Sequence, residues 1–239
     1  MVFSIIIPCK DESEIIEDTI RKLIEELKDY NIEILIIDDF SLDDTLIKVT
    51  HLKKKYNFLK IFNNTKKGLG NAIDLGIINS SGDYILIYMA DMSDDIDDVK
   101  KYFKICYENK NVSAVFGSRF TKTSRLIDYP KKKLVFNRIF NIFVKILYMS
   151  NYNDFTNSFK IYKRNDLLKL RPLVSENFNI FLELPLKIIG RKYKYATTTV
   201  NWKNRTKGKA KFQIKELSSM YIFTLIYCFI EKILINKKN

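Results

Sequence analysis

A carboxylate cluster in the middle of the chain is the feature with the clearest chemical potential. Residues 84–90 form an apolar run, and Asp91, Asp94 and Asp95 follow it within five positions. If the run is a buried strand, Asp91 lies near its carboxyl end, and ligands bind at this edge of an open α/β sheet. Hard oxygen ligands suit Mg²⁺ or Mn²⁺, and such an ion suits a diphosphate. The simpler interpretation is a polar turn followed by an acidic helix start.

Polar residues also follow the other apolar runs of the first 90 residues. A carboxylate there can accept a hydrogen bond from a base or a ribose hydroxyl, and a glycine turn with exposed amides lets the backbone approach a phosphate. A cation can neutralise a leaving diphosphate. Each signal is weak alone, and their order along the chain gives them weight. The residues concerned are Pro8, Asp11, Glu12, Asp38, Asp39, Lys67, Gly68 and Gly70.

The elements that must position these side chains alternate between strands and helices. Continuous apolar runs rich in β-branched residues predict buried parallel strands, and apolar stripes at helical spacing predict the helices between them. This alternation predicts an α/β fold with a mostly parallel central sheet and helices on both faces. Asp11 and Glu14 have capping-box spacing and predict a helix start. The predicted strands are 2–7, 32–37, 59–62, 84–91 and 113–116, with further candidates at 158–162 and 195–202.

Two apolar segments in the second half suggest contact with lipid or another apolar surface. Residues 134–149 are apolar around most of a helix, so that helix is either buried or lies against lipid. Residues 217–235 are apolar but interrupted by Glu231 and Lys232, so the uninterrupted part is shorter than the roughly 20 residues a bilayer crossing needs. A membrane-surface helix or a contact between copies of the chain fits; an ordinary amphipathic helix docked on the sheet is the alternative. The polar stripe of the first segment is Asn137, Arg138, Asn141 and Lys145.

Charge is divided unevenly between the two halves of the 239-residue chain. Residues 1–100 hold 12 basic and 20 acidic side chains, whereas residues 101–239 hold 29 and 8. The basic half predicts an anionic partner, either membrane lipid or a phosphorylated substrate, because no nucleic-acid recognition motif accompanies it. A lysine-rich proteome would also make surfaces basic, but the acidic first half argues against that. Three scattered cysteines fit a reducing compartment, and no signal peptide is expected at residues 3–8.

Five motifs in order resemble a known family. They are Pro8-Cys9-Lys10-Asp11-Glu12, Asp38 to Thr45, Lys67-Gly68-Leu69-Gly70-Asn71-Ala72, Ala90-Asp91-Met92-Ser93 and Gly117-Ser118-Arg119-Phe120. Together they resemble the family 2 GT-A glycosyltransferases, most closely the dolichyl-phosphate mannose synthase-like branch, over roughly residues 1–212. The resemblance implies a GT-A, Rossmann-like fold. It also implies inverting transfer of a sugar from a nucleotide-diphosphate donor with Mg²⁺ or Mn²⁺.

The resemblance also implies roles for individual residues. Pro8, Glu12 and Asp39 would line the nucleoside site, and Asp91 matches the last carboxylate of the metal motif, with Asp94 as a second ligand. Lys160 would lie near phosphate, and Arg205, Lys209 and Lys211 match a later basic motif that approaches donor and acceptor phosphates. Asp91, Lys160 and Arg205 are the implied catalytic residues. The remaining implied donor-binding residues are Lys67, Gly68, Gly70, Ala90 and Arg119.

Several positions depart from the family pattern. Met89 stands where the first metal-motif carboxylate is usual, and a thioether is a poor ligand for a hard cation. Asp94 or Asp95 could replace it, or the ion could be held by Asp91, diphosphate and water, since Mg²⁺ sites often use one or two carboxylates. The other departures are Phe40 for Gly, Asp11 for Asn, Lys160 for Arg and Ala210 for Ser.

These features lead to three functional hypotheses. The first is transfer to a polyprenyl phosphate at the cytoplasmic face of an anionic membrane, with residues 1–120 binding the nucleotide sugar, 121–212 the acceptor, and 213–239 forming a membrane-associated helix. The second is transfer to a saccharide, which needs a carboxylate base and has Asp154, Glu176 and Glu183 as candidates. The third, motivated by Met89 and Phe40, is a non-catalytic nucleotide-sugar-binding module.

Overall fold

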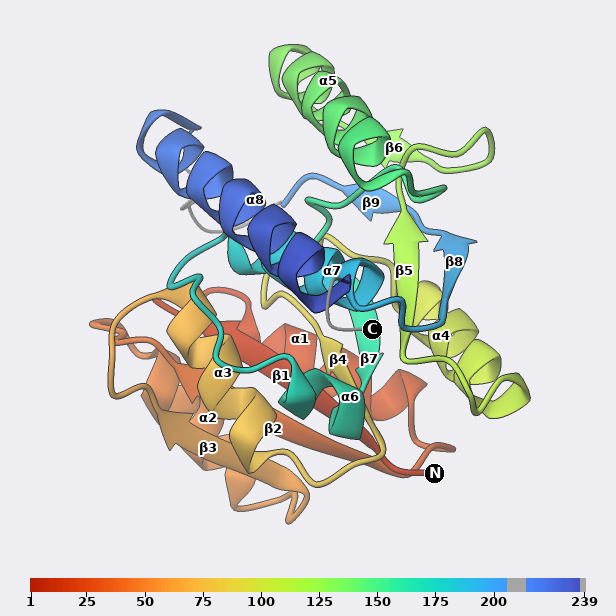
Figure 1. The fold of residues 1–239 in the computed structure, drawn as a ribbon. Coiled ribbons are helices and arrows are strands. Elements are labelled where there is room, and N and C mark those ends of the chain that lie inside the picture. The colour runs from red at the N-terminus through yellow and green to blue at the C-terminus, as the bar shows by residue number, and fades with distance from the viewer. Residues whose placement is uncertain (206–213, 237–239) are drawn as a thin grey trace.

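The computed structural model describes residues 1–205 and 214–236, with side chains from 219 to 235 in the second range. A seven-stranded sheet forms its centre, in the order β3-β2-β1-β4-β7-β5-β8 (Figure 1). Strands β3, β2, β1 and β4 are parallel, β5 and β8 are parallel, and β7 runs antiparallel to both of its neighbours. The strands are β1 (Phe3–Cys9), β2 (Ile32–Asp38), β3 (Leu59–Asn63), β4 (Tyr84–Ile87), β5 (Ala114–Ser118), β7 (Lys160–Lys163) and β8 (Tyr195–Thr199).

Helices cover both faces of this sheet, which confirms the predicted α/β architecture. One face carries α1, α2 and α4, whose apolar side chains join a single buried cluster with β1 and β2. The other face carries α3, α6 and α7, with α5 and α8 packed on the same cluster. The helices are α1 (Ile16–Glu26), α2 (Thr45–Lys53), α3 (Leu69–Asn79), α4 (Ile96–Glu108), α5 (Lys131–Tyr148), α6 (Arg164–Lys169), α7 (Ile180–Gly190) and α8 (Ile214–Asn236).

Strand ends and helix starts differ from the sequence-based prediction in places that matter for the site. β4 ends at Ile87, so Asp91 lies in a loop four residues beyond the strand. α1 begins at Ile16 behind a cap without a side-chain hydrogen bond, and Asp11 has a φ of 46°. The predicted capping box is therefore wrong, because the chain turns sharply at Asp11 before the helix starts.

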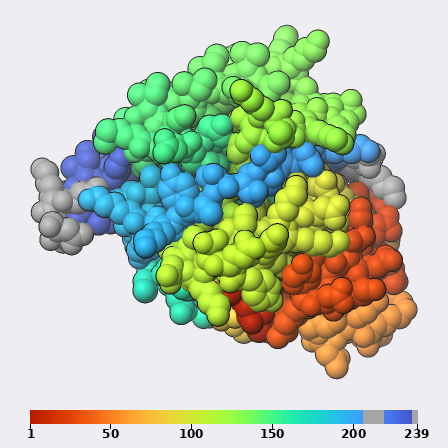
Figure 2. Space-filling model, turned by 90° about the vertical axis from the view of Figure 1, so that its right-hand side faces the viewer, coloured from red at the N-terminus to blue at the C-terminus, as the bar shows by residue number. Residues whose placement is uncertain are grey.

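A short second sheet joins two loops of the second half of the chain. β6 (Leu126–Ile127) pairs with β9 (Trp202–Lys203), and Trp202 also bridges to Asp94. Lys203 donates its backbone N–H to the carbonyl of Ser93 at 2.9 Å. We call residues 200–205 the strap; Figure 2 shows light-blue chain of this region crossing between the green residues above and the yellow-green ones below. The strap therefore lies directly along the acidic loop at residues 91–95.

Candidate functional site

The acidic loop after β4 holds two carboxylates in different surroundings. Asp91 is partly open, with 21% of its side chain exposed, and its Oδ1 accepts the N–H of Ser93 at 3.1 Å. Asp94 is 4% exposed, and neither carboxylate oxygen has a hydrogen-bond partner in the described structure. Burial, and secondarily the nearby charge of Asp91, raise the pKa of Asp94 to about 8. The Asp94 carboxyl is therefore mostly protonated at neutral pH until a cation reaches it.

Arg205 connects the ends of β1 and β4. Its Nη2 lies 3.1 Å from both carboxylate oxygens of Glu12 and 3.5 Å from Oδ2 of Asp91. The backbone of Glu12 is held by Thr45, because the Glu12 N–H donates to Oγ1 of Thr45 at 2.8 Å. The structure thus brings together three residues that the sequence assigned to one site, although nearly 200 positions separate Glu12 from Arg205. Lys209 and Lys211 lie outside the described residues.

Asp39 has a supporting role for the glycine turn. Its Oδ1 accepts the N–H of Gly68 at 2.9 Å and the Asn64 side chain at 2.8 Å. Gly70 donates its N–H to the carbonyl of Glu176 at 2.8 Å, and a Cβ on Gly70 would lie 2.0 Å from the carbonyl oxygen of Ser175. The expectation that these glycine amides are exposed to a phosphate is therefore wrong for Gly68 and Gly70. Glycine at these two positions instead allows the turn to approach the backbone of residues 175 and 176 closely.

The remaining predicted donor-side residues lie at the same edge in different states. Pro8 is buried within β1, and Lys67 is exposed beside the glycine turn. Ala90 is buried, and its carbonyl accepts the Thr19 hydroxyl at 2.7 Å, which ties α1 to the acidic loop. Met89 is partly buried and packs against the apolar cluster. Asp91 therefore has no carboxylate neighbour at position 89.

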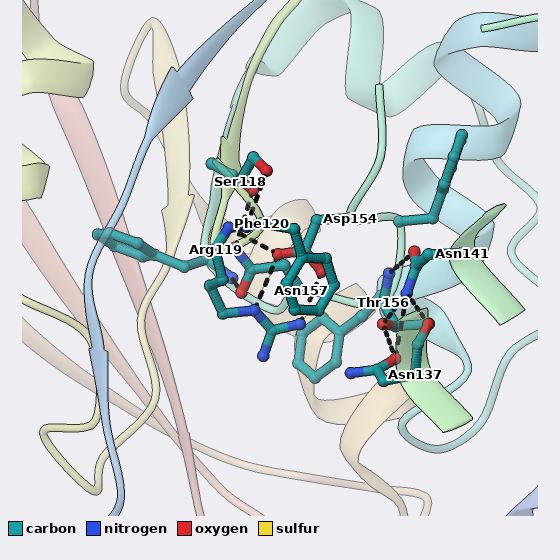
Figure 3. A network of polar contacts seen from close by, with 12 residues as sticks. Ser118, Arg119, Phe120, Asn137, Asn141, Asp154, Thr156 and Asn157 are labelled. Atoms are coloured by element: carbon teal, nitrogen blue, oxygen red, sulfur yellow. Dashed lines mark hydrogen bonds and ion pairs between the residues drawn. The ribbon is translucent and has the colours of Figure 1, made fainter. Parts of the chain in front are cut away.

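Arg119 is held in place by Asp154 at the end of β5. Nε and Nη2 of Arg119 lie 2.9 and 2.7 Å from the two carboxylate oxygens, and its N–H also donates to Asp154 at 2.9 Å (Figure 3). Arg119 is 7% exposed and Asp154 is fully buried. Burial lowers the pKa of the guanidinium, but the Asp154 charge and hydrogen bonds outweigh it and raise the pKa overall. Arg119 is accordingly a rigid permanent cation.

The three candidate bases for a saccharide acceptor are all engaged elsewhere. Asp154 is occupied by Arg119. Glu183 is fully buried, accepts the N–H groups of Val174 and Ser175, and forms an ion pair with Lys187 at 2.9 Å. Glu176 is exposed and forms an ion pair with Lys66. Asp154 and Glu183 are therefore buried and unavailable as bases, whereas Glu176 is exposed in its ion pair.

Lys160 does not present its ammonium group to the site. The side chain is 1% exposed, and Nζ donates to the backbone carbonyls of Phe155 at 3.0 Å and of Asn157. Burial is the main cause that lowers the pKa of Lys160, to about 7. The predicted phosphate contact of Lys160 is thus contradicted, because an ammonium satisfied by buried carbonyls has no group left for a ligand.

Two cations that the sequence analysis did not assign to the site lie beside Arg119. Lys133 has its pKa lowered first by burial and then by the charge of Arg119, while Asp91 acts in the opposite direction. The guanidinium of Arg138 lies 5.0 Å from the centre of the Phe120 ring, and Arg119 lies 5.5 Å from the same ring. The available signal was the run Lys131-Lys132-Lys133 directly before an apolar helix. This run shows that basic residues are present, but it does not show in which direction their side chains leave the helix.

A ring of polar side chains attaches α5 to the loop that carries Asp154. The amide of Asn141 donates to Oγ1 of Thr156 at 3.0 Å, and Thr156 donates to Oδ1 of Asn137 at 2.7 Å (Figure 3). Asn141 is 1% exposed. Asn137 and Asn141 of the predicted polar stripe therefore face inward, whereas Arg138 is exposed; Val144 and Tyr148 are buried, and many other apolar residues of α5 are exposed.

The outer surfaces of α5 and α8 form one apolar face, which we call the helix-pair face. Phe140 meets Tyr221 and Tyr148 meets Phe229, each with ring centres 6.2 Å apart, so the two helices lie side by side. Of the 20 exposed large hydrophobic side chains in the described structure, 14 belong to this face. They are Val135, Phe136, Ile139, Ile142, Phe143, Ile146, Met149, Met220, Ile222, Phe223, Ile226, Ile230, Ile233 and Leu234.

The charges that interrupt α8 point toward the protein. Glu231 forms ion pairs with Arg191 at 2.6 Å and Lys187 at 3.5 Å, both on or next to α7. Lys232 donates to the carbonyl of Tyr148 at 3.3 Å. The helix-pair face is therefore not interrupted by these two charges. Across the described residues, no helix is long and apolar enough to cross a bilayer.

The acidic loop fits a divalent ion held by few protein ligands. Asp91 is partly open, and Asp94 offers two buried oxygens without partners. Among the described side chains, no group of three or more His, Cys, Asp or Glu is placed to bind a metal. Of the described carboxylates, Asp91 and Asp94 are the two candidates in this loop, so phosphate oxygens and water would complete the shell of a hard cation held there.

Comparisons with known proteins agree with this geometry. The model of the family described as "Glycosyl transferase family 2" matches residues 4–171. The chain is 29% identical to a dolichol-phosphate mannosyltransferase of Pyrococcus furiosus over 130 residues, which are 54% of this chain and 36% of that protein. It is 29% identical to a dolichyl-phosphate beta-glucosyltransferase of Dictyostelium discoideum over 220 residues, which are 83% of this chain and 65% of that protein. The chain thus spans only part of the length of these relatives.

A solved structure shows the same fold at low sequence identity. Glucosyl-3-phosphoglycerate synthase from Mycobacterium tuberculosis, in complex with Mn²⁺, UDP-glucose and phosphoglyceric acid, superposes with a TM-score of 0.76. The alignment covers 95% of this chain and 79% of that one at 15% identity. This likeness establishes the architecture described above.

Proposed function

Because this chain belongs to glycosyl transferase family 2, we propose that it transfers a sugar from a nucleotide-diphosphate donor to a polyprenyl phosphate at a membrane surface. One observation carries the proposal: the ends of β1 and β4 meet at Arg205, which contacts both Glu12 and Asp91. Asp39 lies on the adjacent strand end, next to the glycine turn. This arrangement suits a ligand with a nucleoside at one end and a diphosphate at the other.

A divalent ion is part of the proposal. Solved structures of the synthase contain Mn²⁺ or Mg²⁺ with UDP. In this chain Asp91 would hold the ion, and Asp94 would join after losing its proton, as ligand carboxylates must. When bound, the ion supplies positive charge against the departing diphosphate. Arg205 would add a second positive charge from the strap side.

The acceptor side favours a phosphate over a sugar hydroxyl. Arg119 is fixed by Asp154, and Lys133 and Arg138 lie close to it. A phosphate oxygen would bond to the anomeric carbon as the bond from that carbon to the diphosphate oxygen breaks. A phosphate dianion carries no proton to remove, so no general base is needed and positioning supplies most of the catalysis. The engagement of all three candidate bases supports this choice.

The helix-pair face supports a lipid-linked acceptor. α5 carries apolar residues outward and places Lys133 next to Arg119 at its amino-terminal end. A lipid with an anionic head and an apolar tail could therefore lie with its head at the cations and its tail along this face. Such peripheral binding to an anionic membrane combines apolar burial with attraction of basic side chains.

The test is turnover by the full chain in detergent with Mn²⁺, polyprenyl phosphate and a panel of UDP- and GDP-sugars. We expect a sugar-lipid product with at least one donor. Asp91→Asn should lower kcat by about 100-fold, a loss typical of removing one stabilising group. Asp97→Asn is the matched control, because Asp97 is exposed on α4 and forms an ion pair with Lys100. No product with any donor, or equal rates for both variants, would contradict the proposal.

A further inference from the structure

Arg205 contacts the very carboxylates that the proposed donor and metal need. We propose that Arg205 is an internal counter-ion that holds Glu12 and Asp91 in the nucleotide-free protein and moves to the diphosphate when donor and metal bind. The inference rests on the proposed function, and it assigns to one side chain the coupling between metal and nucleotide. It begins from the position of a single nitrogen, Nη2, between the two carboxylates.

The strap delivers Arg205 to this position through several backbone contacts. Trp202 donates its N–H to the carbonyl of Arg125 at 2.9 Å, and Asn204 donates to Ile127 at 3.0 Å. Asn201 donates its N–H to Oδ2 of Asp98 at 2.7 Å. The backbone leading to Arg205 is therefore anchored on both the β6 and α4 sides, so the side chain can change partners without a large movement of the strap.

The contact of Arg205 with Glu12 is of a kind that can exchange. Arg119 binds Asp154 through two nitrogens and two oxygens, which is the strongest geometry for a guanidinium and a carboxylate. Arg205 reaches both oxygens of Glu12 and one of Asp91 through the same nitrogen, so it lacks the parallel fork. Arg119 is therefore built as a fixed cation, and Arg205 as one that can be transferred.

Charge then sets the order of events. Arg205 is always protonated, and its Nη2 lies 3.5 Å from Oδ2 of Asp91, so a metal ion bound at Asp91 is repelled for as long as the guanidinium stays there. A divalent ion arriving alone must compete with that charge and would leave the guanidinium beside it. A diphosphate offers the guanidinium new oxygens at the same moment. Metal and diphosphate are therefore expected to bind together, each improving the affinity of the other.

The test measures two affinities of the full chain and its Arg205→Gln variant. Mn²⁺ binding alone is followed by electron paramagnetic resonance, and pyrophosphate binding at saturating free Mn²⁺ by calorimetry. Relative to wild type, Arg205→Gln should bind Mn²⁺ alone about tenfold more tightly, because the competing charge is gone. The same variant should bind pyrophosphate about tenfold more weakly. A general loss of structure would weaken both affinities, so opposite shifts are specific to the counter-ion role.

Two further variants complete the design. Arg205→Lys keeps the charge and should retain the weak Mn²⁺ affinity of the wild type. Arg125→Gln removes an exposed arginine from the segment that pairs with the strap, and it should change neither affinity. Unchanged or weaker Mn²⁺ binding by Arg205→Gln, with both ligands still bound by the wild type, would overturn this inference alone. A wild type that binds neither Mn²⁺ nor pyrophosphate would overturn the proposed function together with it.

Discussion

At the scale of single residues, the site depends on sharp turns directly after three strands. Asp11, Phe40 and Met92 follow β1, β2 and β4 with φ values of 46°, 60° and 53°. This left-handed conformation is disfavoured for residues with a Cβ, and least so for Asn and Asp. The backbone at Phe40 is therefore strained, and neither β2 nor the buried core requires this conformation.

Phe40→Asn should stabilise the protein. Asparagine tolerates the left-handed region better, and Phe40 is 48% exposed, so little burial is lost. We expect the free energy of unfolding to rise by about 1 kcal/mol in urea denaturation. Phe40→Ala keeps the Cβ and the strain, and should stay within about 0.5 kcal/mol of wild type. An equal gain in both variants would show that loss of the exposed ring, rather than backbone strain, is responsible.

Whether a residue of the site could be predicted depends on whether the sequence encodes the direction of its side chain. Asp91 and Glu12 lie near the expected edge of the sheet, because both follow apolar runs and parallel strands end at the same edge. Lys160 was assigned to the site wrongly, and Lys133 was not assigned to it, because the presence of a basic residue in the sequence does not reveal where its side chain points. Nζ of Lys160 donates to buried carbonyls, whereas burial and then the nearby charge of Arg119 lower the pKa of Lys133 on α5.

At the scale of elements, one carboxylate ties strands together at the edge opposite the site. Glu33 of β2 accepts hydrogen bonds from the Ser4 hydroxyl of β1, from Lys60 of β3 at 2.6 Å, and from Ser81 just before β4. Burial works against its ionisation, but these hydrogen bonds outweigh it and lower the pKa of Glu33 to about 2. The carboxylate is 6% exposed, so this is an interior contact of the sheet.

The lowered pKa of Glu33 predicts a pH dependence of stability. A carboxyl with a depressed folded pKa stabilises the protein above its unfolded value of 4.5, and this contribution is lost as pH falls toward about 2. At pH 7, Glu33→Gln should lower the free energy of unfolding by about 3 kcal/mol, and it should flatten the acid limb of the stability profile. Glu17→Gln removes an exposed ion pair with Arg21 and should change stability by less than about 1 kcal/mol. Parallel acid limbs for wild type and Glu33→Gln would refute this assignment.

The elements that were predicted and those that were missed differ in their pattern of polarity. The central strands were found because strands buried on both faces are continuously apolar. α7 was missed because Glu183, Pro185 and Lys187 interrupt its apolar sequence, although all three are buried. The ion pair between Glu183 and Lys187 is what allows those charges inside. The two residues have i,i+4 spacing on one helix, so their pairing can be read from the sequence, but their burial depends on the docking of α7 against the core.

At the scale of the whole molecule, polarity is reversed on the two outer helices. α5 and α8 turn Asn141, Glu231 and Lys232 inward, and although each helix buries some apolar residues in the core, both expose many others. The apolar character of both segments was evident from composition. Their pairing was not, because it depends on ring contacts between residues about 80 positions apart, such as Phe140 with Tyr221. An extensive exposed apolar face of this kind indicates a partner surface rather than a water-facing one.

The helix-pair face should bind vesicles that contain anionic lipid. Burying a side chain such as Phe136 or Ile226, which are 69% and 53% exposed, contributes about 1.5 to 3 kcal/mol, so a charge at either position should weaken binding at least tenfold. We expect Phe136→Glu and Ile226→Glu to lose co-sedimentation with phosphatidylcholine–phosphatidylglycerol vesicles. Ile47→Glu makes the same change at a 69% exposed site on α2, beyond the opposite face of the sheet, and should bind like wild type. If all three variants sediment equally, membrane contact is made elsewhere, because these positions differ only in the face they occupy.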